Sequence, residues 1–171
     1  MFNFLKKNKP NVSSEYQKWR ELILGLSSTG KMKGIPDELY CVLMDVGMGD
    51  GKSQYFAISM YANNDGESSL KASSGAGVVG LGGIEEISGY PDQIIQIGQS
   101  LIHLTTPTKN YDYPAANKVF FYFLTTSGVR VFKCELNDLK VGHPFNEIFS
   151  RFSTIKGFAD RIVDKPRGTS V

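Results

Sequence analysis

An apolar run from Leu39 to Val46 constrains the fold of this chain more than any other feature. Its length and composition are typical of a strand at the centre of a sheet. The turn signal Asp50-Gly51 follows, and Gln54 to Ala62 then alternates between two faces, as a second strand does. Consecutive strands joined by so tight a turn pair antiparallel, so an antiparallel sheet is expected.

Turn signals further along the chain predict three more strands. The run Asn63-Asn64-Asp65-Gly66 tolerates the positive φ angles of a tight hairpin, and Ser68 to Ser73 is expected to form a short third strand after it. A second hairpin is expected about Ser127-Gly128, between strands at Val119 to Thr125 and Val129 to Leu136. These patterns predict a sheet made of a three-stranded meander plus a hairpin.

Apolar residues at helical spacing predict three helices. The first runs from about 14 to 26 and opens with the S-x-x-Q pattern of Ser14 to Gln17, which is typical of a capping box. Pro91 begins the second helix, which ends before Pro107, because proline fits the first helical turn but not the interior. His143-Pro144 begins the third, in which phenylalanines keep an apolar stripe.

These elements predict a single α+β domain over residues 13–165, because the helices bury their stripes only by covering the sheet. A short helical tail at 157–164 is expected after the third helix. Residues 1–12 are expected to form a flexible N-terminal tail and residues 166–171 a frayed C-terminus.

Composition is that of an ordinary soluble globular protein. Of the 171 residues, 41% are hydrophobic and 21% charged, and the net charge is only +2. So weak a net charge, without a basic stripe, argues against nucleic-acid binding. No apolar run approaches the ~20 residues of a membrane span, which argues against a membrane protein. The order of residues at Met1 to Leu5 is not that of a signal peptide.

Because Cys41 and Cys134 lie far apart in apolar runs, free thiols and a cytoplasmic location are expected.

Two glycine-rich segments resemble phosphate-binding loops but lack the context that such loops need. Gly75 to Gly80 spells G-x-G-x-x-G, yet the preceding segment is mostly polar and positions 93–101 contain no carboxylate for a ribose. Gly49 to Ser53 ends in Gly-Lys-Ser, but Val46 stands where the first glycine of a P-loop is required. Gln54 to Ala62 also alternates like a strand where a helix is needed. Both segments are therefore expected to be structural, and no cofactor is expected.

No pattern predicts a catalytic nucleophile or a metal centre. His103 and His143 have no H-x-x-x-H partner and no nearby cysteine or carboxylate at metal spacing, and the chain lacks a G-x-S-x-G elbow. Helical or capping roles are expected for both histidines. We therefore expect no catalytic residue and no metal.

Two groups of residues remain as candidate sites. Asp45 ends an apolar strand and Glu85 and Glu86 follow the glycine segment, so these carboxylates would form an acidic cluster if their loops meet. The alternative is a solvated loop charge and an acidic pair at a helix start. The second group is Tyr111-Asp112-Tyr113, within the irregular connection 105–117. Its tyrosines either offer contact area for a protein partner or cap the core.

The stretch LYCVLMDVGMGDGKSQYFAISMYANNDGESSLKASSGAGVVGLGG resembles a pattern of small bacterial proteins in which strands precede a glycine segment and a helix. The stretch VFFYFLTTSGVRVFKCEL resembles the hairpin of the same proteins, so the resemblance covers about residues 15–160. It includes no catalytic residue. Some such proteins accompany secreted polymorphic toxins, so the resemblance implies an immunity role. The charge of +2 departs from the acidic inhibitors of nuclease toxins, and a non-nuclease toxin is in less conflict with it.

Three hypotheses follow. The first is a non-enzymatic cytoplasmic binding protein, an immunity protein that neutralises a cognate toxin through protein–protein contact. The second is a small hydrolase or ligand-binding domain that uses Asp45 with Glu85 or Glu86, which requires these carboxylates to converge. The third is a homo-oligomer in which the segment from Gly75 to Gly83 pairs across a symmetry axis.

Overall fold

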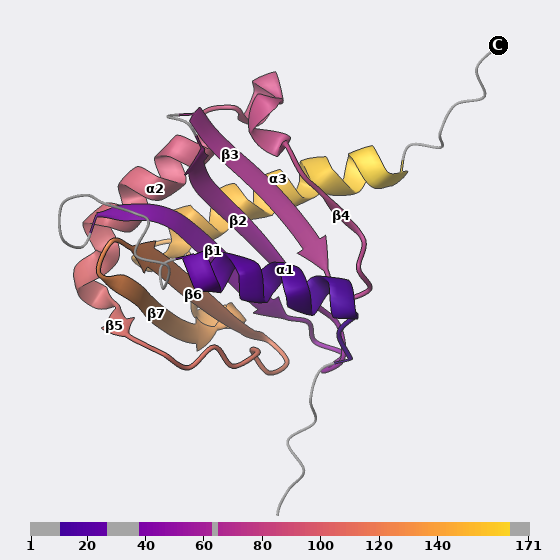
Figure 1. The fold of residues 1–171 in the computed structure, drawn as a ribbon, viewed down its shortest axis with the longest axis horizontal. Helices are drawn as coiled ribbons and strands as arrows, with labels where there is room; N and C mark the ends of the chain where they lie inside the picture. The colour runs from indigo at the N-terminus through magenta and orange to yellow at the C-terminus, as the bar shows by residue number, and fades with distance from the viewer. Residues whose placement is uncertain (1–10, 27–37, 63–64, 165–171) are drawn as a thin grey trace, which may run out of the picture.

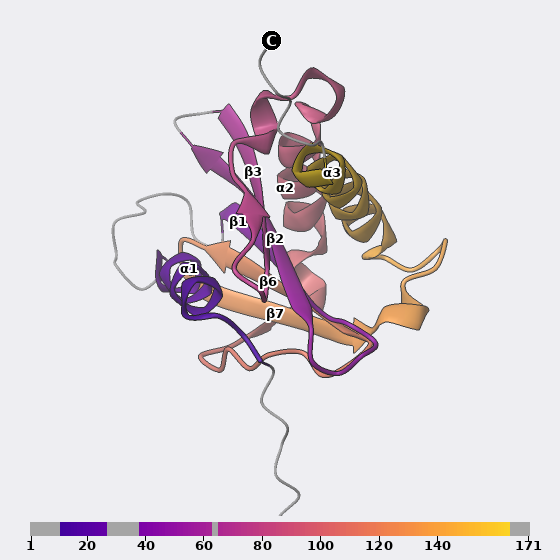
Figure 2. The ribbon, with the colours of Figure 1, turned by 90° about the vertical axis from the view of Figure 1, so that its right-hand side faces the viewer.

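The computed structural model describes residues 11–26, 38–62 and 65–164. One antiparallel sheet of seven strands lies at the centre, in the order β4-β3-β2-β1-β6-β7-β5. Helix α1 (Ser14–Gly25) covers one face of this sheet, and α2 (Tyr90–Leu101) and α3 (Asn146–Asp164) cover the other (Figures 1 and 2). This arrangement confirms the predicted α+β class.

Strand β1 (Leu39–Gly47) lies in the middle of the sheet, and all nine of its residues are buried. It pairs with β2 (Gln54–Ala62) on one side and with β6 (Lys118–Thr125) on the other. Strand β3 (Asp65–Ala72) continues the sheet beyond β2, and β7 (Gly128–Glu135) continues it beyond β6. The predicted meander and the predicted hairpin therefore meet along β1 in one sheet.

The sheet has more strands than the predicted meander plus hairpin. Strand β4 (Gly77–Val78) pairs with β3 at one edge, and β5 (Thr106–Pro107) pairs with β7 at the other. A strand is predicted from alternating apolar and polar residues, and two residues are too few to show this alternation. The third strand also begins at Asp65 and not at the predicted Ser68, because the turn residues already pair with the end of β2.

The first two helices begin close to their predicted positions. Ser13 caps α1, since its Oγ accepts a hydrogen bond from the Tyr16 backbone N–H at 3.2 Å, one residue before the predicted Ser14. Pro91 lies in the first turn of α2, as predicted. A 3₁₀ turn (η4, Ile102–Leu104) follows α2 before the chain reaches β5.

The third helix and the predicted helical tail at 157–164 form one continuous helix. Buried Phe152 and Ala159 continue the apolar stripe across Gly157. Packing against the sheet thus outweighs the roughly 1 kcal/mol that glycine costs inside a helix. The helix also begins later than the predicted start at His143-Pro144.

Alternating side chains of the sheet form two apolar cores. The α2/α3 face includes Met44 and Phe121, whereas the α1 face includes Leu43 and Tyr122. Asp45 is an exception, because it is a fully buried carboxylate in the most buried strand. Within the described ranges, none of the helices has the length and apolarity that a membrane crossing requires.

The predicted flexible tails lie, apart from Asn11 and Val12, outside the described residues. The same holds for most of the loop that joins α1 to β1.

Candidate functional site

A buried ion pair joins α1 to the central strand of the sheet. The Nε of Arg20 lies 2.7 Å from Oδ2 of Asp45, and the two side chains are 3% and 0% exposed. The hydroxyl of Tyr16, one turn earlier on α1, donates to the other Asp45 oxygen at 3.1 Å. Both carboxylate oxygens therefore accept hydrogen bonds inside the protein, which is the condition for burying a charge stably.

The same arginine holds the loop that contains the predicted tyrosine segment. Its Nη1 donates to the carbonyl oxygen of Tyr111 and its Nη2 to that of Asp112, each at 2.8 Å. The hydroxyl of Tyr122, on β6, donates to the Asp112 carbonyl at 2.9 Å. Arg20 thus ties α1, β1 and the loop before β6 together at one point.

The pKa values of the three hydrogen-bond donors in this network, Arg20, Tyr16 and Tyr122, are all raised. Burial lowers the pKa of the Arg20 guanidinium, but the Asp45 carboxylate and nearby hydroxyls outweigh burial and raise it. Burial is also the largest cause that raises the pKa values of Tyr16 and Tyr122. It raises the pKa of the Asp45 carboxyl as well, against the opposing charge and hydrogen bonds of Arg20 and the bond from Tyr16. Arg20 and both tyrosines therefore keep their donor protons.

The outer side of the loop presents the three residues singled out from the sequence. Tyr111 and Tyr113 are half-buried, and Asp112 is exposed. The guanidinium carbon of Arg20 lies 4.5 Å from the ring centroid of Tyr113, and the Tyr111 ring stands edge-on to that of Tyr122 at 6.1 Å. The two tyrosines therefore pack against the core of the α1 face and stay partly exposed.

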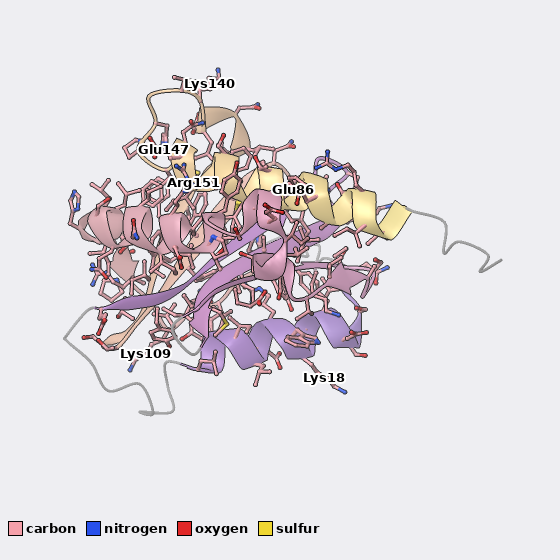
Figure 3. All side chains as sticks on the ribbon, turned by 90° about the horizontal axis from the view of Figure 1, so that it is seen from above. Lys18, Glu86, Lys109, Lys140, Glu147 and Arg151 are labelled. Atoms are coloured by element: carbon pink, nitrogen blue, oxygen red, sulfur yellow. The ribbon has the colours of Figure 1, made fainter. Side chains whose placement is uncertain are left out.

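The three carboxylates of the predicted acidic cluster are not brought together. Asp45 points to the α1 face, where it is enclosed by Arg20. Glu85 and Glu86 are exposed in a 3₁₀ turn (η3, Glu85–Ile87) whose Ile87 belongs to the core of the α2/α3 face. Figure 3 shows Glu86 beside α3, on the opposite side of the molecule from α1. Asp45 therefore does not form an acid–base pair with Glu85 or Glu86.

Arg20, Tyr16 and Tyr122 are not among the residues that sequence motifs single out. A signal exists, because Tyr16, Arg20 and Leu24 recur every four residues along the buried side of α1. A charged residue inside an apolar stripe requires a buried partner. The carboxylate inside the most apolar strand, Asp45, was the partner available.

No described group of three or more histidine, cysteine or acidic residues is arranged to hold a metal ion. His103 is exposed in η4, and the Nδ1 of half-buried His143 accepts a hydrogen bond from the Phe145 backbone N–H at 3.2 Å. His143 therefore has the local capping role expected of it, although in the connection before α3.

The segment from Gly75 to Gly83 has a structural reason for its glycines. Gly75 and Gly80 have φ angles of 95° and 82°, which glycine adopts without strain. A Cβ at Gly77 would strike the backbone carbonyl of Leu70 on β3. Strand β4 and a 3₁₀ turn (η2, Leu81–Gly83) follow, in place of the helix that a dinucleotide loop requires.

Replacing Gly77 by valine is expected to lower the free energy of unfolding by more than about 1 kcal/mol, because the added atoms meet backbone that cannot move aside cheaply. Gly83→Val is the control, since a Cβ there meets nothing within 4 Å. Urea unfolding measures the stability of both variants.

NAD, NADP, ATP and GTP are expected to leave the melting temperature unchanged. A ligand bound at 100 times its Kd would add about 2.7 kcal/mol to the free energy of unfolding. A rise with any nucleotide, abolished by Gly77→Val, would contradict this.

Asp50 closes the loop whose Gly-Lys-Ser ending resembles a P-loop. Its Oδ1 accepts from the backbone N–H groups of Lys52 and Ser53, and its Oδ2 accepts from the Ser53 hydroxyl at 2.6 Å. These bonds lower the pKa of Asp50 to about 2. Their stabilising effect is therefore present above about pH 4 and lost as the pH falls towards 2. An NMR titration of the carboxyl carbon is expected to show this low midpoint, and a midpoint near 4 would rule out the loop geometry.

The two cysteines are expected to be unreactive in the native state. Burial raises the pKa of Cys41 to about 12, and burial followed by the charges of Asp138 and Glu135 raises that of Cys134 to about 11. Because only the thiolate attacks, labelling by iodoacetamide at pH 8 should be at least tenfold slower than in urea-unfolded protein. Native labelling of Cys41 as fast as in the unfolded chain would contradict its burial.

No family model matches the chain, and neither does any curated protein or solved structure.

Proposed function

We propose that this protein is a non-enzymatic cytoplasmic binding protein that recognises a protein partner through Tyr111, Asp112 and Tyr113. We further propose that it is an immunity protein, which neutralises a cognate bacterial toxin by contact. The observation that carries the binding role is the pair of hydrogen bonds from buried Arg20 to the Tyr111 and Asp112 carbonyls. A loop held in place before the partner arrives loses less conformational entropy on binding.

The chemistry of the loop surface supports a protein partner. The carbonyls of Tyr111 and Asp112 are turned inward to Arg20 and Tyr122, which leaves the exposed Asp112 side chain and the half-buried tyrosine side chains for a partner. Tyrosine contributes large contact area with few rotatable bonds and a hydroxyl for hydrogen bonding, which makes it frequent in protein interfaces. Asp112 lies between the two tyrosines with its carboxylate exposed, where it bonds to Asn110 at 2.9 Å. An aromatic pair with a polar centre suits recognition of a specific protein surface.

The immunity role rests on the resemblance of the strand and glycine-segment pattern to proteins that accompany polymorphic toxins. The hydrolase alternative has less support, because Asp45 is enclosed by Arg20 and Tyr16 and lies on the other face from Glu85 and Glu86. Protein contact, unlike the proposed hydrolase, does not require Asp45 to converge with Glu85 or Glu86.

The test is capture of a partner from the protein's own bacterium with the tagged full chain. We expect a protein encoded by a neighbouring gene to be captured, and co-expression of the chain to restore growth to cells that produce it. Asp112→Lys should abolish both effects, because it inverts the charge at the centre of the proposed surface. The control is Gln96→Lys, an exposed position on α2, across the sheet. Absence of any partner and of any protection would refute the proposal.

A further inference from the structure

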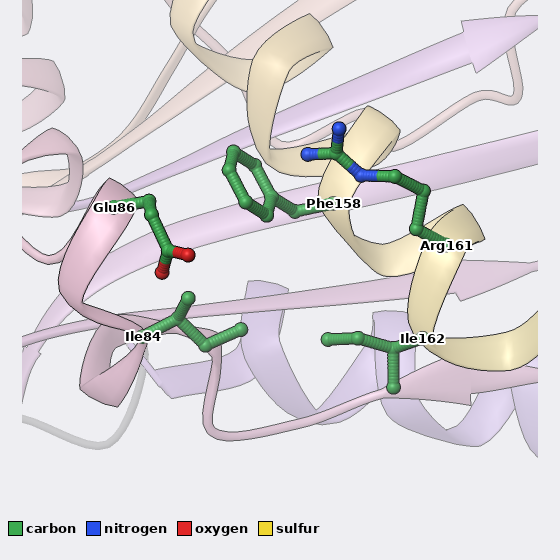
Figure 4. Close-up of a pocket in the computed structure, with 5 residues that line it drawn as sticks. All are labelled: Ile84, Glu86, Phe158, Arg161 and Ile162. Atoms are coloured by element: carbon green, nitrogen blue, oxygen red, sulfur yellow. The ribbon is translucent and has the colours of Figure 1, made fainter. Parts of the chain in front are cut away.

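A hollow of about 470 Å³ opens on the surface between the η3 turn and the last turns of α3 (Figure 4). Ile84 and Glu86 line it on one side, and Phe158, Arg161 and Ile162 line it on the other. Phe158 and Ile162 are four residues apart and share one face of α3. Ile162 is 44% exposed, so the apolar lining of the hollow is open to water.

The two charged side chains at the hollow are not paired with any described residue. Neither the Glu86 carboxylate nor the Arg161 guanidinium forms an ion pair or a side-chain hydrogen bond within the described part of the chain. The guanidinium carbon of Arg161 lies 4.1 Å from the ring centroid of Phe158, and Figure 4 shows Glu86 across that ring from Arg161. The hollow therefore has an apolar centre between one negative and one positive group.

We propose that this hollow is the contact surface of a homodimer and that its occupant is a second copy of this chain. A two-fold axis at the rim of the hollow lets the exposed Ile162 side chain of each copy enter the hollow of the other, with Glu86 of each copy opposite Arg161 of the other. The patch is thus complementary to itself. A partner with one sign of charge would be attracted by one of these groups and repelled by the other.

The place of the hollow in the fold allows such a contact. The C-terminal turns of α3 lie at the edge of the molecule (Figure 1), and Glu86 lies on the opposite side from Lys18 and Lys109 (Figure 3). The surface is therefore separate from the tyrosine loop and does not depend on the proposed function. It also differs from the pairing of Gly75 to Gly83 that the third hypothesis from the sequence invoked. Five lining residues form a patch well below the ~800 Å² per partner of a standard interface, so the dimer is weak.

Sedimentation equilibrium of the full chain, from about 10 μM to 1 mM, tests the dimer. We expect the mass of the wild type to rise with concentration from 18.9 kDa towards twice that value. Glu86→Arg and Arg161→Glu should each weaken association at least tenfold, because like charges then meet twice across the axis. An equimolar mixture of these two variants should associate again, since each copy supplies the charge that the other lacks. The double variant should also associate as the wild type does.

Glu147→Arg is the control, because Glu147 lies in the first turn of α3 and pairs with Arg151 of its own helix. It should leave association unchanged. Circular dichroism and the melting temperature establish that each variant folds. A mass that stays at 18.9 kDa up to 1 mM, association that survives both single charge reversals, or a mixture of the two that fails to associate would each overturn the proposal.

Discussion

Replacing Asp45 by alanine is expected to lower the free energy of unfolding by about 3–5 kcal/mol. The substitution leaves the guanidinium of Arg20 buried without its counter-charge and the hydroxyl of Tyr16 without its acceptor. An uncompensated buried charge is among the most destabilising changes that a single substitution makes. Equilibrium unfolding in urea, followed by circular dichroism, measures the loss.

Two comparisons separate the buried pair from an ordinary ion pair. Glu135→Ala removes the partner of Lys118 on the surface, where both side chains are about half exposed, and should cost less than about 1 kcal/mol. The double variant Arg20→Met with Asp45→Leu removes both charges and should be more stable than Asp45→Ala by about 1 kcal/mol or more. An Asp45→Ala variant no less stable than Glu135→Ala would contradict the burial of the pair.

Phe145→Ala should have a similarly large effect, about 3–5 kcal/mol of unfolding free energy. Phe145 is 1% exposed and its ring stacks on that of Phe132 at 3.9 Å, with further aromatic contacts to Phe121 and Phe123 on β6. Its removal leaves a cavity between the start of α3 and the sheet. The control is Val141→Ala, at a 97% exposed position of the same connection, which should change stability by less than about 0.5 kcal/mol. Equal unfolding midpoints for the two variants would rule out this packing.

The long strands were predictable because their patterns have physical causes that act locally. A strand covered on both faces, such as β1, needs apolar residues throughout, and the turns at Asp50-Gly51 and Ser127-Gly128 set antiparallel pairing around it. Strands β4 and β5 were not predictable, since a two-residue strand exists only because a longer neighbour offers it free backbone groups. The continuity of α3 across Gly157 likewise depends on packing against the sheet.

The candidate site was predictable only in its outer residues. The segment from Tyr111 to Tyr113 stands out because it places two aromatic side chains, with Asp112 between them, in an irregular connection. The side to which Asp45 points depends on the register of β1 with β2 and β6, which no single strand pattern specifies. The sequence therefore left open whether Asp45 joined Glu85 and Glu86 or was a solvated loop charge, and both readings of Asp45 are wrong because it is fully buried against Arg20. Asp45 instead holds Arg20, which binds the loop.

Isothermal titration calorimetry of the captured partner against the purified chain measures whether the tyrosine loop is the binding surface. We expect a saturable complex with the wild type, and the same affinity with Gln96→Lys, on the far face of the sheet. Binding to Asp112→Lys should be at least tenfold weaker, because hot-spot energy concentrates at the centre of an interface. Equal affinities of the partner for the wild type and for Asp112→Lys would contradict the claim that the tyrosine loop is the binding surface.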